Sequence, residues 1–456
     1  MTAAKTIVIL VLAVLVSDAP ARAQGYGLYE QGTCAMGRAG AGVAAPCSDG
    51  SAIFFNPAGL ALETAPVVSA EITAVAPRGG FTNSTTLLVS TLNKRTIAAP
   101  AAYGAVPIGE HVVAGIGVLA PYGLVTDWPN TSEGRFLGYF SSIKSYYFQP
   151  TIAASLSSHV LVGGGVDVTH TRLELRRRVD LSTLPIAGTP FTFGVLGVPR
   201  GTDFADTNLT GSGNHVGGHV GAIVKANDQV SFGARYLFRQ QVTISNGTVA
   251  TTQIPTNLVL RVPLAGLPAG TPIDAIVAPA FAPGAPLSNQ TATTALPLPD
   301  QFVVGVAIHP TQTFTLLADY QRTHWSLFDA ITITNQFAPP TVLVESYGDT
   351  DGVRIGGEYA IGTAIVRAGF DAHNAGAPDQ TVTPLLPEAA RKEVAAGVTL
   401  PVSSNLRLDF AYMFVNQSDR AGRSTDGGLA VPTAAVNNGT YHYHANLFSA
   451  GVTVHF

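Results

Sequence analysis

The sequence predicts an all-β fold, a transmembrane antiparallel β-barrel of about fourteen strands with an N-terminal hatch in its lumen. Three observations lead to this prediction. Segments of roughly ten residues alternate apolar side chains with small, polar or charged ones, which is the period of β-strands. Only 12% of the 456 residues are charged, about half the share usual for soluble domains. Although 46% are hydrophobic, no apolar run reaches the roughly 18 residues of a spanning helix.

Charge excludes further classes of protein. The formal net charge is −4, and the one basic run is 176–178, whereas nucleic-acid binding needs a concentrated positive face. A soluble β-sandwich also alternates, but its outward face carries far more lysine and glutamate than this chain contains. We therefore expect outer-membrane lipid around the barrel and no nucleic-acid partner.

Residues 1–23 have the pattern of a signal peptide. Lys5 precedes the apolar run 7–16, and Ala21 and Ala23 supply the small residues of a cleavage site. The run is too short to span a membrane as a helix. We expect the mature chain to begin at Gln24 and to reach the bacterial outer membrane.

Residues 24–65 are expected to form the hatch, because they lack clean alternation and are rich in glycine and alanine, which allow a compact plug. The only two cysteines, Cys34 and Cys47, would meet an oxidising compartment after export, which favours a disulfide over two buried free thiols. In Asn56-Pro57-Ala58, proline fixes φ and asparagine can hydrogen-bond neighbouring backbone, so the motif predicts a rigid turn.

Residues 66–456 are expected to form the barrel. In 406–415, for example, Leu406, Leu408 and Phe410 share one face, while Arg407 and Asp409 share the other. Fourteen such segments are expected, at 66–77, 96–107, 110–120, 143–156, 159–173, 213–226, 229–243, 301–310, 313–325, 351–361, 363–372, 393–401, 405–416 and 443–456.

The connections alternate strictly between short and long. Short turns and long outer loops are typical of such barrels, so both termini are expected on the periplasmic side. The long connections are 78–95, 121–142, 174–212, 244–300, 326–350, 373–392 and 417–442.

Several motifs together resemble the FadL-type family of outer-membrane transporters for long-chain fatty acids and other hydrophobic compounds. The resemblance covers the whole mature chain and implies a fourteen-stranded barrel with a hatch, capture between outer loops, a pocket in the barrel and lateral exit at a kink in the third strand. The motifs are Gly37-Arg38-Ala39-Gly40, Asn56-Pro57-Ala58-Gly59-Leu60, Leu298-Pro299-Asp300, Leu317-Ala318-Asp319-Tyr320 with Trp325-Ser326, Val353–Tyr359 with Arg367-Ala368-Gly369-Phe370, and Leu386-Pro387-Glu388.

The resemblance suggests roles for particular residues. In the third segment, Gly115, Gly117, Pro121 and Gly123 weaken a strand ladder and permit a bulge, although glycine is common in barrel strands. Two long connections are unusually apolar, which is typical of a binding surface, while the alternative is a loop packed on itself as a lid. The candidate capture residues are Leu258, Leu260, Leu264, Phe281, Phe191 and Phe193.

Four arginines are candidates for binding a ligand carboxylate, because guanidinium pairs with carboxylate in a fork. They are Arg235, Arg239, Arg354 and Arg367. The alternative is that most of them pair inside the lumen with acids of the chain, since buried charges need partners. The expected partners are Asp167, Asp319, Glu358, Asp371 and Asp409.

The expected function is uptake of fatty acids or aromatic hydrocarbons by a monomer, by passive diffusion and without a cofactor or metal. The alternatives are a barrel enzyme of the lipase type and a structural or adhesive barrel. His215 with His219 and His442 with His444 share strand faces, but neither pair has a carboxylate at metal-ligand spacing, and the chain has no G-x-S-x-G motif.

Overall fold

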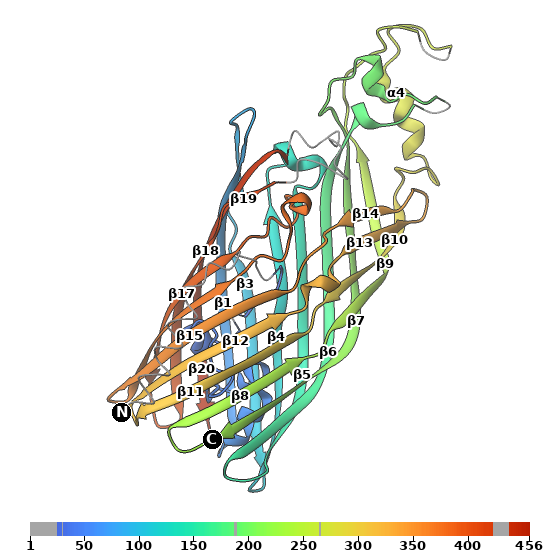
Figure 1. The fold of residues 1–456 in the computed structure, drawn as a ribbon. Helices are drawn as coiled ribbons and strands as arrows, with labels where there is room; N and C mark the ends of the chain where they lie inside the picture. Colours follow the sequence, from blue (N-terminus) through green and yellow to red (C-terminus); the bar gives the residue numbers. More distant parts are fainter. Residues whose placement is uncertain (1–24, 30, 187–188, 264–265, 423–436) are drawn as a thin grey trace.

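The computed structural model describes residues 25–29, 31–186, 189–263, 266–422 and 437–456. The expected signal peptide and Leu264 lie outside the described residues. The described chain forms a closed antiparallel barrel of 14 wall strands, which confirms the predicted fold class (Figure 1). The first and last wall strands pair from Val67 with His455 to Asn83 with Gly439 and close the ring.

Several wall strands are split, so the described ranges contain more strand elements than wall positions. Split pairs are β8 with β9, β10 with β11, β12 with β13, and β14 with β15, while β2 and β19 are short additions near the outer rim. The elements are β1 (Val67–Asn83), β2 (Val89–Thr91), β3 (Ile97–Ile108), β4 (Val112–Asp127), β5 (Phe140–Ser155), β6 (Val160–Asp180), β7 (Asp203–Lys225), β8 (Val230–Leu237), β9 (Gln240–Gln253), β10 (Gln290–Leu298), β11 (Gln301–Thr311), β12 (Phe314–Thr323), β13 (Ala330–Asn335), β14 (Thr341–Val344), β15 (Thr350–Ile361), β16 (Ala364–His373), β17 (Arg391–Pro401), β18 (Leu406–Gln417), β19 (Arg420–Ala421) and β20 (Gly439–His455).

Helical elements are short, and no helix of the described ranges has the length and apolarity to cross a membrane. Three lie in the N-terminal segment, and the others lie in the connections between strands. They are α2 (Thr33–Met36), α3 (Ala52–Phe55), η1 (Pro57–Leu62), η2 (Glu133–Phe136), η3 (Leu181–Thr183), η4 (Phe193–Leu196), α4 (Ile273–Val277), η5 (Ala278–Phe281), η6 (Trp325–Leu327) and η7 (Asp379–Thr381).

Alternation in the sequence becomes an outward and an inward face in the wall. On β5, Phe148 and Ile152 are exposed on the outside, while Gln149 and Thr151 are buried on the inside. This is the reverse of a soluble protein and matches a strand between lipid and a filled lumen.

Several strands extend beyond their predicted ends. β4 ends at Asp127 rather than at 120, and β7 begins at Asp203 rather than at 213. The expected loops 244–300 and 326–350 contain strands, among them the end of β9 and all of β10. These extensions lie beyond the apolar band, where neither face meets lipid, so their sequences do not alternate clearly. The expected loop lengths were wrong for this reason.

The N-terminal segment lies inside the ring of strands (Figure 1) and is almost entirely buried. Wall glycines make room for it on several sides: a side chain at Gly163 would overlap Pro57, and one at Gly369 would overlap Arg38. An added Cβ at Gly397 would stand 2.9 Å from the Cα of Gly37. The barrel and the segment therefore fit each other closely.

Candidate functional site

An apolar cavity of about 200 Å³ opens in the outer half of the lumen, beside the N-terminal segment. It extends from the inside of β18 and β20 to the edges of β3 and β4. Its lining includes Leu28, Gln31, Val75, Ile97, Ala98, Ala99, Pro100, Ala120, Tyr122, Leu124, Ile143, Leu386, Val415, Tyr443 and Leu447. A concave and mostly apolar space of this kind suits a hydrophobic small molecule.

The cavity reaches a gap in the wall between β3 and β4. These strands pair only from Ala102 with Val118 to Ile108 with Val112, nearer the periplasmic end. Farther out, β4 keeps its pairing with β5 but shifts register between Leu119 and Tyr122. Such a shift is a β-bulge, which bends the strand away from one neighbour. The two strands are therefore separated along the stretch where the cavity meets the wall.

The start of the N-terminal segment occupies the edge of β4 that β3 leaves free. The amide of Leu28 donates to Pro121 O at 2.8 Å, and the amide of Gly123 donates to Tyr26 O at 2.9 Å. The side chain of Gln31 donates to Ala120 O at 2.9 Å and accepts from Ala120 N at 3.2 Å. Four hydrogen bonds thus connect the segment directly to the bulge.

The predicted kink residues fall into two groups. Pro121 lies in the register shift, and Gly123 lies just beyond it, against Leu28. Gly115 and Gly117 instead lie in the regularly paired part of β4, where an added Cβ would stand 3.1 Å from Ile53. The prediction that Gly115 and Gly117 belong to the kink therefore needs correction. Because they have no side chain, they leave room for the N-terminal segment.

Asn56 joins the N-terminal segment to the wall on the other side. Its Nδ2 donates to Val43 O at 2.7 Å and to Ala222 O of β7 at 3.0 Å, while its Oδ1 accepts from Ala58 N at 3.1 Å. Pro57 opens η1, and its backbone lies against Gly163 of β6. The turn predicted from Asn56-Pro57-Ala58 is therefore held between the segment and two wall strands.

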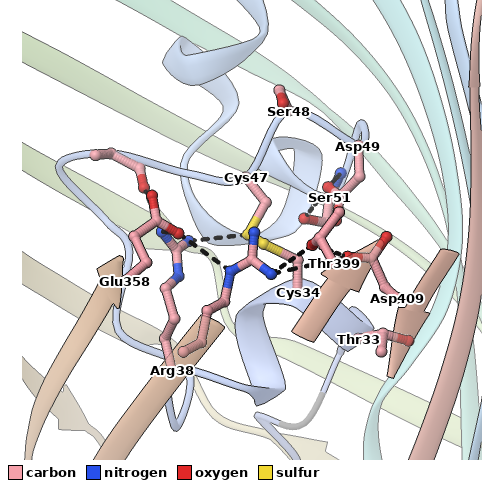
Figure 2. Close-up of a disulfide and its surroundings, with 12 residues drawn as sticks. Thr33, Cys34, Arg38, Cys47, Ser48, Asp49, Ser51, Glu358, Thr399 and Asp409 are labelled. Carbon is pink, nitrogen blue, oxygen red and sulfur yellow. Dashed lines mark hydrogen bonds and ion pairs between the residues drawn. A yellow bond between two sulfur atoms is a disulfide. The ribbon is translucent and has the colours of Figure 1, made fainter. Parts of the chain in front are cut away.

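A disulfide joins Cys34 and Cys47 and encloses the loop that carries Arg38 (Figure 2). Arg38 Nη2 lies 3.0 Å from Cys47 Sγ, and its Nη1 donates to Ala45 O at 3.2 Å. The guanidinium also lies 3.6 Å from Glu358 of β15. Arg38 is buried, so this ion pair connects the cross-linked loop to the wall away from water.

Most buried acids of the lumen have partners. Asp371 lies 3.3 Å from Arg354, and Glu358 lies 3.1 Å from Arg367. Asp319 accepts the amides of Gly42 and Val43 at 2.7 and 3.0 Å and so binds the N-terminal segment rather than an arginine. Two of the four candidate arginines are therefore engaged in ion pairs.

The other two candidate arginines differ from each other. Arg239 is exposed in the break between β8 and β9, so it does not face the lumen as expected. Arg235 is buried, donates to Tyr29 Oη at 2.8 Å and Gln301 Oε1 at 3.2 Å, and lies 4.2 Å above the ring of Phe54. Its Nε and Nη2 have no hydrogen-bond partner among the described residues. Of the four candidates, Arg235 is thus the one that is buried without an ion pair among the described residues.

The apolar outer connections pack on each other. Leu260 and Phe193 are buried in one cluster near α4, and Leu258 and Phe281 are partly buried against it, whereas Phe191 is 54% exposed. This arrangement matches the alternative of a self-packed lid more closely than an open capture surface. An open groove lies lower, between the upper parts of β6, β7, β9, β13 and β14.

One side-chain arrangement resembles a hydrolytic triad. His219 Nδ1 lies 2.5 Å from Asp167, and its Nε2 lies 3.0 Å from Thr151 Oγ1. All three residues are buried on the inner wall, and η1 packs over β5, β6 and β7 at this place. A nucleophile needs access to its substrate, so this network is structural here.

Residues that sequence reasoning missed include Gln31 and Glu388. The Glu388 carboxylate accepts hydrogen bonds from three backbone amides, those of Gly25 at 3.2 Å, Gly376 at 3.1 Å and Ala377 at 3.1 Å. It thus fixes the first described residue of the N-terminal segment to the connection before β17. The motif Leu386-Pro387-Glu388 drew attention to this stretch of the sequence. It did not indicate that the Glu388 carboxylate binds the backbone of the N-terminal segment.

We predict an abnormal titration for Glu63, at the end of η1. Burial, reinforced by the negative charge of Asp49, raises the pKa of this carboxyl to about 7. Because the folded state holds the proton more tightly than the unfolded chain, docking of η1 should weaken as pH rises from about 4.5 through 7. Isotope-edited infrared spectra should show one carboxyl titrating near pH 7, and Glu63→Gln should remove it. A spectrum without that titration would contradict the prediction.

Comparisons with known proteins agree with this architecture. Residues 13–456 match the family model described as outer membrane protein transport protein (OMPP1/FadL/TodX). The 47 kDa outer membrane protein of Pasteurella multocida is 24% identical over 412 residues, which is 90% of each chain. A Pseudomonas aeruginosa FadL homologue has a TM-score of 0.78 at 18% identity and covers 94% of this chain and 99% of its own. The toluene transporter TodX of P. putida has a TM-score of 0.67 at 14% identity, covering 95% and 99%.

Proposed function

The chain belongs to the FadL/TodX family of outer-membrane transport proteins, and from this premise we propose that it carries hydrophobic small molecules by passive diffusion. The observation that carries the proposal is the apolar cavity that ends at the gap between β3 and β4. A molecule in the cavity could leave sideways into lipid without crossing the buried charges of the N-terminal segment. Neutral hydrocarbons and the tails of fatty acids both suit such a lining.

In this proposal the N-terminal segment is a hatch and its first residues are the gate. The backbone of Tyr26 and Leu28 and the side chain of Gln31 occupy the free edge of β4. An occupied edge keeps the gap narrow, so exit requires these hydrogen bonds to open. The binding of a ligand beside Leu28 and Gln31, which both line the cavity, would favour that opening.

Uptake by cells that lack their own hydrophobic channels tests the proposal. Expression of the chain should give energy-independent uptake of a labelled fatty acid or aromatic hydrocarbon, and no uptake of a sugar of similar mass. A panel of both ligand types, measured in competition, would then identify the preferred class. Equal uptake with and without the chain would refute the proposal.

Replacement of Gln31 tests the gate. Gln31→Met keeps the length of the side chain but removes both hydrogen bonds to Ala120. Each such bond contributes about 1 kcal/mol, so the loss of both should make the open state roughly thirtyfold more populated, and uptake should accelerate by up to that factor. Gln31→Glu keeps the acceptor for Ala120 N but turns a carboxylate oxygen toward Ala120 O, so it should also open the gate. Identical rates in all three proteins would show that Gln31 has no gating role.

A further inference from the structure

Two cations face each other on the outer surface of the wall. Lys144 of β5 and Arg172 of β6 are exposed and lie directly opposite each other in the register of these strands. Like charges in opposed positions repel and destabilise a sheet. No ion pair of the described residues includes either side chain, because Glu174 pairs with Arg176 and Asp127 pairs with Arg95. This wall therefore maintains a repulsive pair that an external anion would neutralise.

The height of the pair on the wall indicates which anion it meets. One step toward the periplasm, Tyr146 lies opposite His170, and the next pair is Phe148 with Val168. Phe148 and Val168 are 43% and 44% exposed and belong to the lipid-facing band. Tyrosine marks the boundary of that band. Lys144 and Arg172 thus lie at the level of the outer-leaflet head groups.

The arginine is held in place for such a contact. Arg172 Nε lies 3.3 Å from His170 Nε2, and His170 Nδ1 lies 2.7 Å from Asn214 Oδ1 of β7. The terminal guanidinium nitrogens have no acceptor in the part of the chain that is described. A guanidinium with two free nitrogens beside an ammonium is well suited to bind a phosphate.

Another part of the wall treats a similar position differently. Arg322 of β12 lies two residues beyond the outward-facing Tyr320, as Lys144 lies two residues beyond Tyr146. Arg322, however, pairs with Asp349 and Asp351 at 3.1 Å each. An acidic partner is therefore possible at this height, and its absence at Lys144 and Arg172 points to a partner outside the chain.

We propose that Lys144 and Arg172 bind a phosphate of an outer-leaflet lipid of the lipid A type. The pair supplies charge to the phosphate, and the outward side chains of Phe148 and Val168 below it contact the acyl chains. Lys144 also borders the outer mouth of the apolar cavity, so the bound lipid flanks the gap between β3 and β4. The proposal does not depend on what the cavity carries.

Native mass spectrometry of the mature chain in mild detergent tests the proposal. Lipid A with two phosphates should bind as one adduct, whereas its dephosphorylated form should not. Lys144→Gln with Arg172→Gln should weaken the adduct roughly 10- to 30-fold, since each cation near a lipid surface contributes about one tenfold step or slightly less. Lys144→Arg with Arg172→Lys keeps both charges and should keep the adduct. Lys392→Gln removes a lone exposed lysine from β17 and should bind like the original chain.

Each other outcome would overturn the proposal. Equal binding by the double glutamine variant would remove the two residues from any role, and a loss of binding counts only if the barrel of that variant still resists unfolding in cold detergent. An equal loss with Lys392→Gln would show a general charge effect. Equal binding of the dephosphorylated lipid would exclude phosphate recognition. Displacement by a tenfold excess of inorganic phosphate, or by a fatty acid, would show that the partner is not this lipid.

Discussion

Ala99→Trp should reduce uptake of hydrophobic ligands at least tenfold while leaving the barrel intact. Ala99 lies on the part of β3 that does not pair with β4, and its side chain lines the cavity. An indole would fill much of a space of about 200 Å³ and would obstruct the stretch that leads to the gap. Uptake should fall because the ligand loses both its binding space and its exit. Initial uptake rates of a labelled ligand measure the effect.

Ala102→Trp is the matched control. Ala102 lies three residues farther along the same strand, is exposed on the outer face, and pairs with Val118. The same indole there would meet lipid, so uptake and insertion should be normal. If cells with Ala99→Trp and cells with Ala102→Trp both take up the ligand at the original rate, the cavity is not part of the uptake pathway.

The wall was predictable because each residue there meets one of two different surroundings. On β18, Phe410 faces outward and is exposed, while Asp409 faces inward and is buried, so the alternation could be read from the sequence alone. The same reasoning failed above the apolar band. β13 and β14 are only 6 and 4 residues long there, too short for an alternation of the length seen in the wall segments, so they could not be told from a loop.

The site was less predictable, because its residues act through partners distant in sequence. Nothing in the sequence around Gln31 marks it as special, because its role depends on two hydrogen bonds to Ala120, which is 89 residues away in the chain. Gly115 illustrates the ambiguity of glycine: a missing side chain can weaken a strand or admit a neighbour, and only the position of Ile53 distinguishes the two. Pro121, by contrast, disturbs its own strand, which is a local effect that the sequence does contain.

Asn56→Asp should detach the hatch turn from the wall and make the channel leak small polar solutes. The change is nearly isosteric and keeps the acceptor for Ala58 N, but it replaces the Nδ2 donor with an oxygen. That oxygen would face the carbonyls of Val43 and Ala222, both of which would lose their hydrogen bond from the side chain. An unsatisfied buried polar group costs about 1–3 kcal/mol, so two of them should open the turn in a large fraction of molecules.

Single-channel recordings in planar bilayers would measure the leak. The original chain should be closed to potassium chloride, and Asn56→Asp should show long openings, because η1 no longer packs over β5, β6 and β7. Pro57→Ala is the matched control: it relaxes the fixed φ but keeps all three hydrogen bonds of Asn56, so openings should be rare. The wall strands are unchanged in both variants, so both should insert and keep their resistance to heat. If channels with Asn56→Asp stay as closed as those of the original chain, the side-chain hydrogen bonds of Asn56 do not hold the hatch. Close packing against Gly163 and Gly369 must then suffice to seal the lumen.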